Sequence, residues 1–191
     1  MIKGHFEDLE SRKAELEELI LALAAPYQQE LAILQTAPGI SSIFTAIGII
    51  SEIGTNMEAF PSAKHLCSWA GLTPTNNESA GKKKSVRVSK AGCYIKPLLV
   101  QCANAVVTSK KHPEIRNRYL RLKKRRGHKK AIIAIARMLL TALYHMLKNG
   151  ENYNAELYRK SDLPPADREI TVEQAIIIAR NQGYKIKPAT A

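Results

Sequence analysis

The chain has 191 residues, of which 45% are hydrophobic and 24% charged, an ordinary composition for a soluble globular domain. Its formal charge of +12 is not ordinary and indicates a polyanionic partner, with nucleic acid favoured over an anionic membrane surface. The three cysteines form no C-x-x-C pair, which predicts small buried residues in a reducing cytoplasm and argues against a zinc site.

The positive charge is concentrated in the middle of the chain. Residues 82–130 contain 17 basic residues and a single acid, Glu114, whereas residues 1–81 contain 4 basic and 10 acidic residues. A localised excess of this kind is typical of a binding surface and not of a general solubility device.

The first predicted element is a helix within residues 1–33. Apolar residues recur at alternating spacings of three and four, and Leu9, Leu16 and Leu23 lie one heptad apart. Two interpretations remain open: an amphipathic helix that packs on its own domain, or a coiled coil that joins the chain into a homodimer or higher oligomer. Because the heptad pattern begins directly at Met1, we also expect this chain to be a piece of a longer protein.

The next element, residues 34–54, has the outline of a helix-hairpin-helix. Pro38 and Gly39 separate two helical patterns, and the second helix carries isoleucines at helical spacing. In such a motif the free backbone N–H groups receive a phosphate, which makes Gly39 a candidate nucleic-acid contact. Ser41 and Ser42 stand where a second glycine is expected, so a purely structural hairpin is an equal alternative.

A helix with Leu66, Trp69 and Ala70 facing inward is predicted before Gly71 and Pro74, and a turn-rich serine loop follows at residues 75–92. The loop contains Ser79 and a basic stretch in which Val86 and Val88 alternate with polar residues, as in a short strand or extended arm. Its candidate nucleic-acid contacts are Lys82, Lys83, Lys84, Arg87 and Lys90.

A basic helix is predicted over residues 113–130 and a buried core helix over residues 131–148. The basic helix is so dense in cations that mutual repulsion should destabilise it unless phosphates neutralise them. The core helix is short for a membrane span and contains Arg137. The candidate contacts of the basic helix are Arg121, Lys123, Lys124, Arg125, Arg126, Lys129 and Lys130.

The predicted fold is mainly α: an N-terminal coiled-coil helix (1–33), a compact helical domain (34–153) with at most a small β element, and a linker, short helix and tail (154–191). The chain contains no P-loop, HExxH or G-x-S-x-G motif, and no pair of carboxylates at i, i+3 or i+4 that faces a predicted pocket. Any catalysis would therefore use a nucleophile and positive charge from this chain, with the base or metal supplied from outside.

Several sequence motifs, taken in their order along the chain, resemble those of a known protein family. The stretches "LQTAPGI", "SAKHLCSWAGLTP", "ESAGKKK", "VSKAG" and "IKPLL", followed by "RLKKRRGHKKAIIAIARMLLTALYHMLKNGENY", resemble the C-terminal transposase domain of the insertion-sequence one-ten family. The resemblance covers residues 34–153, which is most of the chain.

This resemblance implies an RNA-guided DNA recombinase with two catalytic parts. A resolvase-like domain with four acidic residues and Mg²⁺ is expected to act with a C-terminal domain that supplies a serine nucleophile. Ser79 is the matching serine, and Ala80 stands where relatives have a glycine. The acidic domain has no counterpart in these residues, so we expect no cofactor in this chain and no activity of the chain alone.

The function predicted from the sequence is therefore that of the DNA-binding, catalytic-serine domain of a cytoplasmic transposase. DNA is the expected partner, with a guide RNA beside it, and no membrane association is expected. The alternatives are a noncatalytic helix-hairpin-helix module and a coiled-coil assembly protein whose basic block is incidental.

Overall fold

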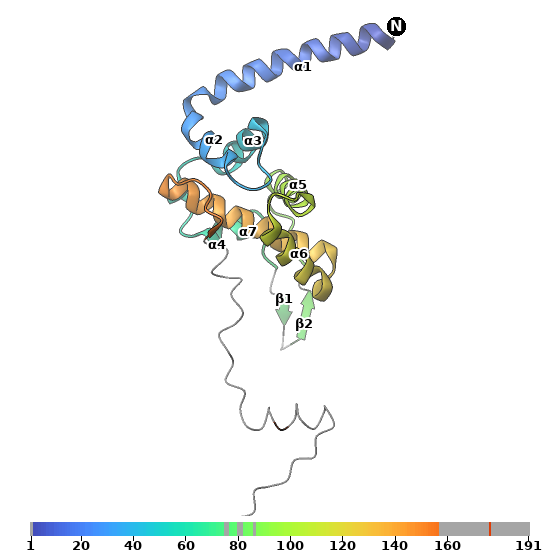
Figure 1. The fold of residues 1–191 in the computed structure, drawn as a ribbon, viewed down its shortest axis with the longest axis vertical. Helices are drawn as coiled ribbons and strands as arrows, with labels where there is room; N and C mark the ends of the chain where they lie inside the picture. Colours follow the sequence, from blue (N-terminus) through green and yellow to red (C-terminus); the bar gives the residue numbers. More distant parts are fainter. Residues whose placement is uncertain (1, 75–76, 80–81, 86, 157–175, 177–191) are drawn as a thin grey trace, which may run out of the picture. The chain divides into compact units, whose positions relative to one another are not determined.

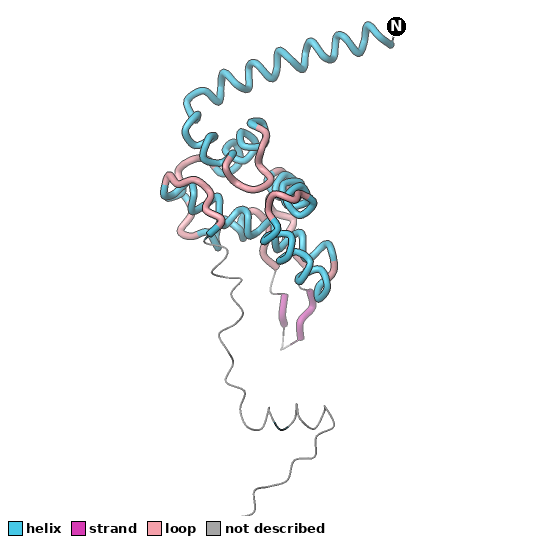
Figure 2. Tube along the Cα trace, viewed as in Figure 1, coloured by secondary structure: helices cyan, strands magenta, loops and turns pink. Residues whose placement is uncertain are grey.

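The protein is mainly helical, as the computed structural model in Figures 1 and 2 shows. The structure describes residues 2–74, 77–79, 82–85, 87–156 and 176. Over these residues the prediction of a mainly α fold with a small β element is confirmed. The helices are α1 (Ile2–Ala24), α2 (Gln28–Gln35), α3 (Ile43–Ile53), α4 (Ala63–Trp69), α5 (Ile95–Thr108), α6 (Pro113–Arg126) and α7 (His128–Asn149), with 3₁₀ turns at Ala25–Tyr27 and Met57–Ala59, and the strands are β1 (Asn77–Ser79) and β2 (Lys82–Ser85).

The core is built around α7, which contacts α2, α4, α5 and α6. Its apolar residues recur every three to four positions, so Ile135, Leu139, Leu140 and Leu143 are all buried on the faces that meet these helices. By length and composition α7 could also cross a membrane, but 56% of its most apolar stretch is buried among the other helices. The apolar residues of α7 are thus explained by their burial in the core of the domain.

The long N-terminal helix α1 makes little contact with the rest of the domain. Phe6, Leu9 and Leu16 are 60%, 51% and 58% exposed, and Ala24 in the last turn is the first buried residue of the helix among those described. Packing of α1 on its own domain, one of the two interpretations of the heptad pattern, is therefore wrong for most of the helix. The apolar seam of α1, which includes Phe6, Leu9 and Leu16, is open to solvent.

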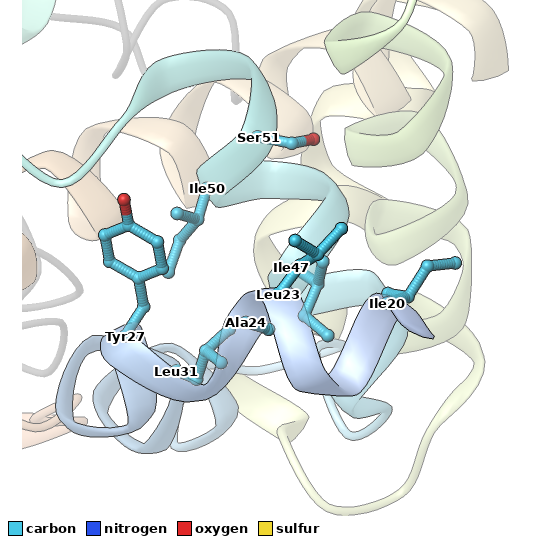
Figure 3. Close-up of a pocket in the computed structure, with 8 residues that line it drawn as sticks. All are labelled: Ile20, Leu23, Ala24, Tyr27, Leu31, Ile47, Ile50 and Ser51. Carbon is cyan, nitrogen blue, oxygen red and sulfur yellow. The ribbon is translucent and has the colours of Figure 1, made fainter. Parts of the chain in front are cut away.

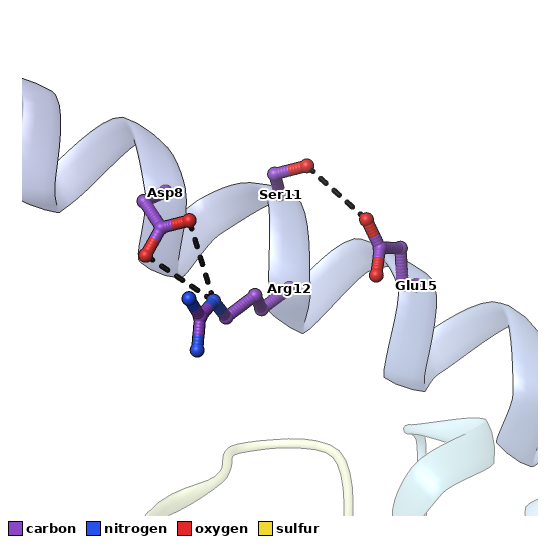
Figure 4. A network of polar contacts seen from close by, with 4 residues as sticks. All are labelled: Asp8, Ser11, Arg12 and Glu15. Atoms are coloured by element: carbon purple, nitrogen blue, oxygen red, sulfur yellow. Dashed lines mark hydrogen bonds and ion pairs between the residues drawn. The ribbon is translucent and has the colours of Figure 1, made fainter.

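Polar pairs within α1 support the helix locally. Arg12 Nε lies 3.2 Å from an Asp8 carboxylate oxygen, and the Ser11 hydroxyl donates to Glu15 at 3.5 Å, each pair four residues apart (Figure 4). Such exposed pairs stabilise a helix by only about 0.2–0.5 kcal/mol each. They favour the helical conformation without burying its seam.

An apolar hollow of about 270 Å³ lies where the last turns of α1 meet α3 (Figure 3). Ile20 and Leu23 of α1 face Ile47 and Ile50 of α3 across it, and Tyr27 lies at its edge. The hollow continues the exposed seam of α1 onto the body of the domain.

The link between α2 and α3 turns at Pro38 and Gly39, as the sequence indicates. Gly39 has φ of 83°, and a Cβ there would lie 2.5 Å from the carbonyl oxygen of Cys102 in α5. This glycine is required because the hairpin backbone packs directly on the α5 backbone. A loss of DNA binding on substitution of Gly39 would therefore report a displaced hairpin as readily as a lost phosphate contact.

The short helix α4 ends in a Schellman motif. The Gly71 N–H donates to the Ser68 carbonyl at 3.0 Å and the Leu72 N–H to the Cys67 carbonyl at 2.9 Å, with Gly71 at φ of 65°. Leu66 and Ala70 are buried as predicted, but Trp69 is 44% exposed, so its inward placement was wrong. Cys93 is also exposed, unlike the buried Cys67 and Cys102.

The basic helix expected over residues 113–130 is divided into two at Gly127. Gly127 has φ of 79°, a conformation that a helix cannot continue, and its N–H closes the last turn of α6 on the Lys123 carbonyl. Lys129 and Lys130 consequently belong to the first turn of α7. The core helix begins at His128, three residues before its expected start.

The chain divides into two units, residues 1–154 and residues 155–191. Of this second unit the structure describes Ala155, Glu156 and Ile176. The predicted short helix and tail otherwise lie outside the described residues.

Candidate nucleic-acid interface

Ser79 lies at the end of β1 in an antiparallel hairpin. Ser79 is paired with Lys82 and Glu78 with Lys83, while a β-bulge separates Glu78 from Asn77. The pairing brings the serine backbone opposite the first residue of a lysine run, Lys82 to Lys84. Ala80 lies outside the described residues. The backbone thus presents the candidate nucleophile and three candidate phosphate-binding residues on one two-stranded arm.

The arm leaves and rejoins the domain at one point. An isolated antiparallel bridge joins Pro74 to Val88, and the described strands pair mainly with each other. Arg87, just before the bridge, and Lys90, two residues after it, are exposed, and Arg87 takes part in a further contact. Five candidate contacts, Lys82, Lys83, Lys84, Arg87 and Lys90, therefore follow one another along the returning half of the arm and the residues just after it.

A second group of cations covers the end of α6. Lys123, Lys124, Arg125 and Arg126 form its last turn, and all four are exposed, as is Arg121 one turn earlier. Cations in the last turn of a helix are favourable because the carbonyl end of the helix carries a partial negative charge. This contribution offsets part of their mutual repulsion.

The first turn of α7 continues this surface with the exposed Lys129 and Lys130. Here the cations meet the positive end of a helix dipole, which disfavours them. Gly127, at the N-cap, has no side chain to accept a hydrogen bond from the first N–H groups. Free N–H groups beside lysines form an arrangement that suits a phosphate oxygen.

The junction between α6 and α7 is fixed by an aromatic cluster that the sequence did not reveal. The Tyr119 hydroxyl and the Nδ1 of His128 are 2.8 Å apart, and the two rings meet edge-on with centroids 6.0 Å apart. Lys123 Nζ lies 5.8 Å from the centroid of the Tyr119 ring. Because Tyr119 is buried, this cluster ties the exposed cations of both helices to the core.

Acidic residues are scarce along this surface, since Glu114 is the single acid of residues 82–130. Ion pairs join Lys3 to Glu7, Arg12 to Asp8 and Lys13 to Glu17 within α1, and His112 to Glu114 at the start of α6. Leaving aside Arg121, which makes another contact, no described acid pairs with the exposed cations between Arg116 and Lys130. The surface is therefore available to an external polyanion.

The described residues contain no group of three or more His, Cys, Asp or Glu side chains that could hold a metal ion. The buried Cys102 thiol is a poor nucleophile, since burial raises its pKa to about 11 and keeps it protonated at neutral pH. Among the serines of the basic region, the pairing of β1 with β2 places the backbone of Ser79 opposite Lys82.

Comparison with known proteins identifies the class. Residues 31–120 match the family described as the transposase IS116/IS110/IS902 family, and this segment contains the serine arm and most of α6. Over these 90 residues, slightly less than half of the chain, the sequence is similar to insertion-sequence transposases of the IS116/IS110/IS902 family.

A curated protein shows a similar likeness. The chain is 29% identical over 127 residues to the insertion element IS110 uncharacterized 43.6 kDa protein of Streptomyces coelicolor. The match covers 65% of this chain and 30% of that protein, so the chain spans less than a third of the length of its relative. No solved structure matches the chain.

Proposed function

We propose that this chain contributes the DNA-binding, catalytic-serine domain of a transposase. The observation that carries the proposal is the place of Ser79: it ends β1, opposite Lys82, on an arm that lies within the segment matching the transposase family. The +16 net charge of residues 82–130 supports DNA as the substrate.

The proposed step is a transesterification at a DNA phosphodiester. The Ser79 Oγ–phosphorus bond forms as one phosphorus–oxygen bond of the DNA backbone breaks, and the departing sugar oxygen becomes a hydroxyl. The lysines of β2 stabilise the negative charge that develops on the phosphate oxygens, an effect that grows as water is excluded. The step conserves the energy of the bond, so the broken strand can be rejoined by the reverse reaction.

The serine proton needs an acceptor, because a serine hydroxyl is a weak nucleophile at neutral pH. The lysines are protonated and do not readily accept it. We place the acceptor, and any Mg²⁺, in an acidic domain outside these residues. The proposed setting is the cytoplasm, with a guide RNA as a further polyanionic partner.

The experiment that tests the proposal is the capture of a covalent protein–DNA adduct. The chain is incubated with DNA, Mg²⁺ and the acidic domain of a family transposase, denatured, digested, and analysed by mass spectrometry. We expect the DNA-bearing peptide to contain Ser79, because this serine is the proposed point of attachment. Attachment at another residue, or strand exchange without any adduct, would contradict the proposal.

We further propose that α1 joins two or more copies of the chain through its exposed seam, since Leu9 and Leu16 have no partner in their own domain. Sedimentation velocity should show an oligomer for the intact chain and a monomer after Leu9→Glu and Leu16→Glu together. The matched control changes two exposed acids of the same helix, Glu10→Gln and Glu18→Gln, and should remain oligomeric. An oligomer that survives the leucine changes would place the interface elsewhere.

A further inference from the structure

The base of the serine arm is held by unusually close backbone packing. Gly71, just before the arm, and Gly92, just after it, have φ of 65° and 67°. A Cβ on Gly71 would collide with the Ala91 carbonyl oxygen, and a Cβ on Gly92 with the Ala70 carbonyl oxygen. The two ends of the arm therefore cross in contact, at a point where α4 ends and α5 begins.

One side chain lies at this crossing. The Lys96 ammonium donates to the carbonyl oxygens of Ser89 and Ala91, both at 2.7 Å. It also lies 2.8 Å from the position that a Cβ on Gly71 would occupy. Hydrogen bonds from a charged donor at this length are about twice as strong as neutral ones. Lys96 thus ties the returning end of the arm to the first turn of α5.

The presence of a lysine at position 96 is not explained by the stability of α5. Lys96 is the second residue of α5, where the positive end of the helix dipole disfavours a cation. The helix is instead anchored by Ile95 and Leu99, which are fully buried. The ammonium acts on the arm and not on the core.

We propose that Lys96 is a positioning residue for Ser79: it fixes the base of the arm and, through the arm, the place of the nucleophile. The inference rests on the proposed function of Ser79. Ser79 lies five positions after Pro74, a reach of at most about 17 Å at the rise of a strand. A swing of roughly 10° at the base would displace the serine by about 3 Å, and a displacement of even about 1 Å can lower a rate about 10²-fold.

The first test compares Lys96→Met with Lys64→Met, which removes an exposed lysine of α4 that makes no described contact. Amide hydrogen exchange is measured on peptides from residues 71–92 and from α7. We expect exchange in residues 71–92 to rise about tenfold or more in Lys96→Met, with α7 unchanged, because opening is confined to the arm. The control should match the wild type in both regions.

The second measurement is the yield of the covalent adduct in the presence of the acidic domain. Lys96→Met should lower the rate of adduct formation about 10- to 100-fold, while its DNA affinity stays within about twofold of that of Lys64→Met. Restoring the ammonium should restore the rate. This is done by alkylating a Lys96→Cys variant with 2-bromoethylamine in a Cys93→Ser background, which removes the exposed thiol.

Two results would overturn the inference: unchanged exchange in residues 71–92, or an equal rise in α7, which would show general destabilisation. Failure of the proposed function is a separate outcome. If Ser79→Ala still forms the adduct, Ser79 is not the nucleophile, whereas the exchange measurement, which uses no DNA, still decides whether Lys96 fixes the arm.

Discussion

Ser79→Ala is expected to abolish the covalent protein–DNA adduct, with a loss of more than about 10³-fold when the acidic domain and Mg²⁺ are supplied. Removal of a nucleophile leaves no atom to form the bond to phosphorus, so the loss should far exceed that from removal of a supporting group. The measurement is the fraction of labelled DNA that stays with the protein on a denaturing gel. Binding should change by less than about twofold, because a hydroxyl contributes little to an electrostatically driven complex.

The matched control for this experiment is Ser85→Ala. Ser85 ends β2 and is paired with Asn77, so it lies in the same hairpin but at the opposite end from the paired Ser79 and Lys82. We expect the adduct yield of Ser85→Ala to match that of the wild type. An equal yield from Ser79→Ala and wild type would remove the serine from the mechanism and leave DNA binding as the function of the arm.

Neutralising the last turn of α6 should produce the second large effect. With Lys123, Lys124, Arg125 and Arg126 all changed to Gln, DNA affinity near 0.1 M salt should fall about 10³-fold, and the slope of log affinity against log salt should become shallower by about 3.6. The reason is that each phosphate contact releases about 0.9 of a condensed counterion. Both quantities come from one fluorescence titration series in increasing salt.

Net charge alone could lower the affinity, so the control removes four cations elsewhere. Changing Lys3, Arg12, Lys13 and Lys64 to Gln lowers the charge equally, but three of these residues lie in α1, beside acids. We expect a change in affinity below about threefold and a nearly unchanged salt slope. Similar losses for both quadruple variants would mean that the α6 end is not the contact surface.

Much of the fold could be predicted because its strongest signals are local. The heptad of α1, the turn at Pro38 and Gly39 and the apolar repeat of α7 each depend on residues within a few turns of one another. The division at Gly127 could not be predicted, since an isolated glycine within a helical pattern is tolerated at about 1 kcal/mol. Packing of α6 and α7 against each other decides that the chain turns there.

The charged residues of the candidate site could be predicted from the sequence, whereas the contacts that hold them in place could not. Lysines and arginines can be recognised as candidate phosphate contacts from residue type alone. Tyr119 and His128 are nine positions apart and come into contact only because the chain turns at the end of α6. The contacts of Lys96 could not be predicted for another reason. Its hydrogen-bond acceptors are backbone carbonyl oxygens, which every residue type has. The exposure of Trp69 was missed because helical spacing shows which residues share a face, and not which faces find a neighbour.

The closed base of the serine arm has a consequence for how such a domain can change over time. Because the chain leaves and re-enters the body at Pro74 and Val88, residues inserted or deleted between them alter the reach of the arm while α4 and α5 keep their places. The helical body can thus stay constant while the arm is shortened, extended or exchanged. Divergence among relatives in the distance between these two points would then adjust where the serine meets its DNA without refolding the protein.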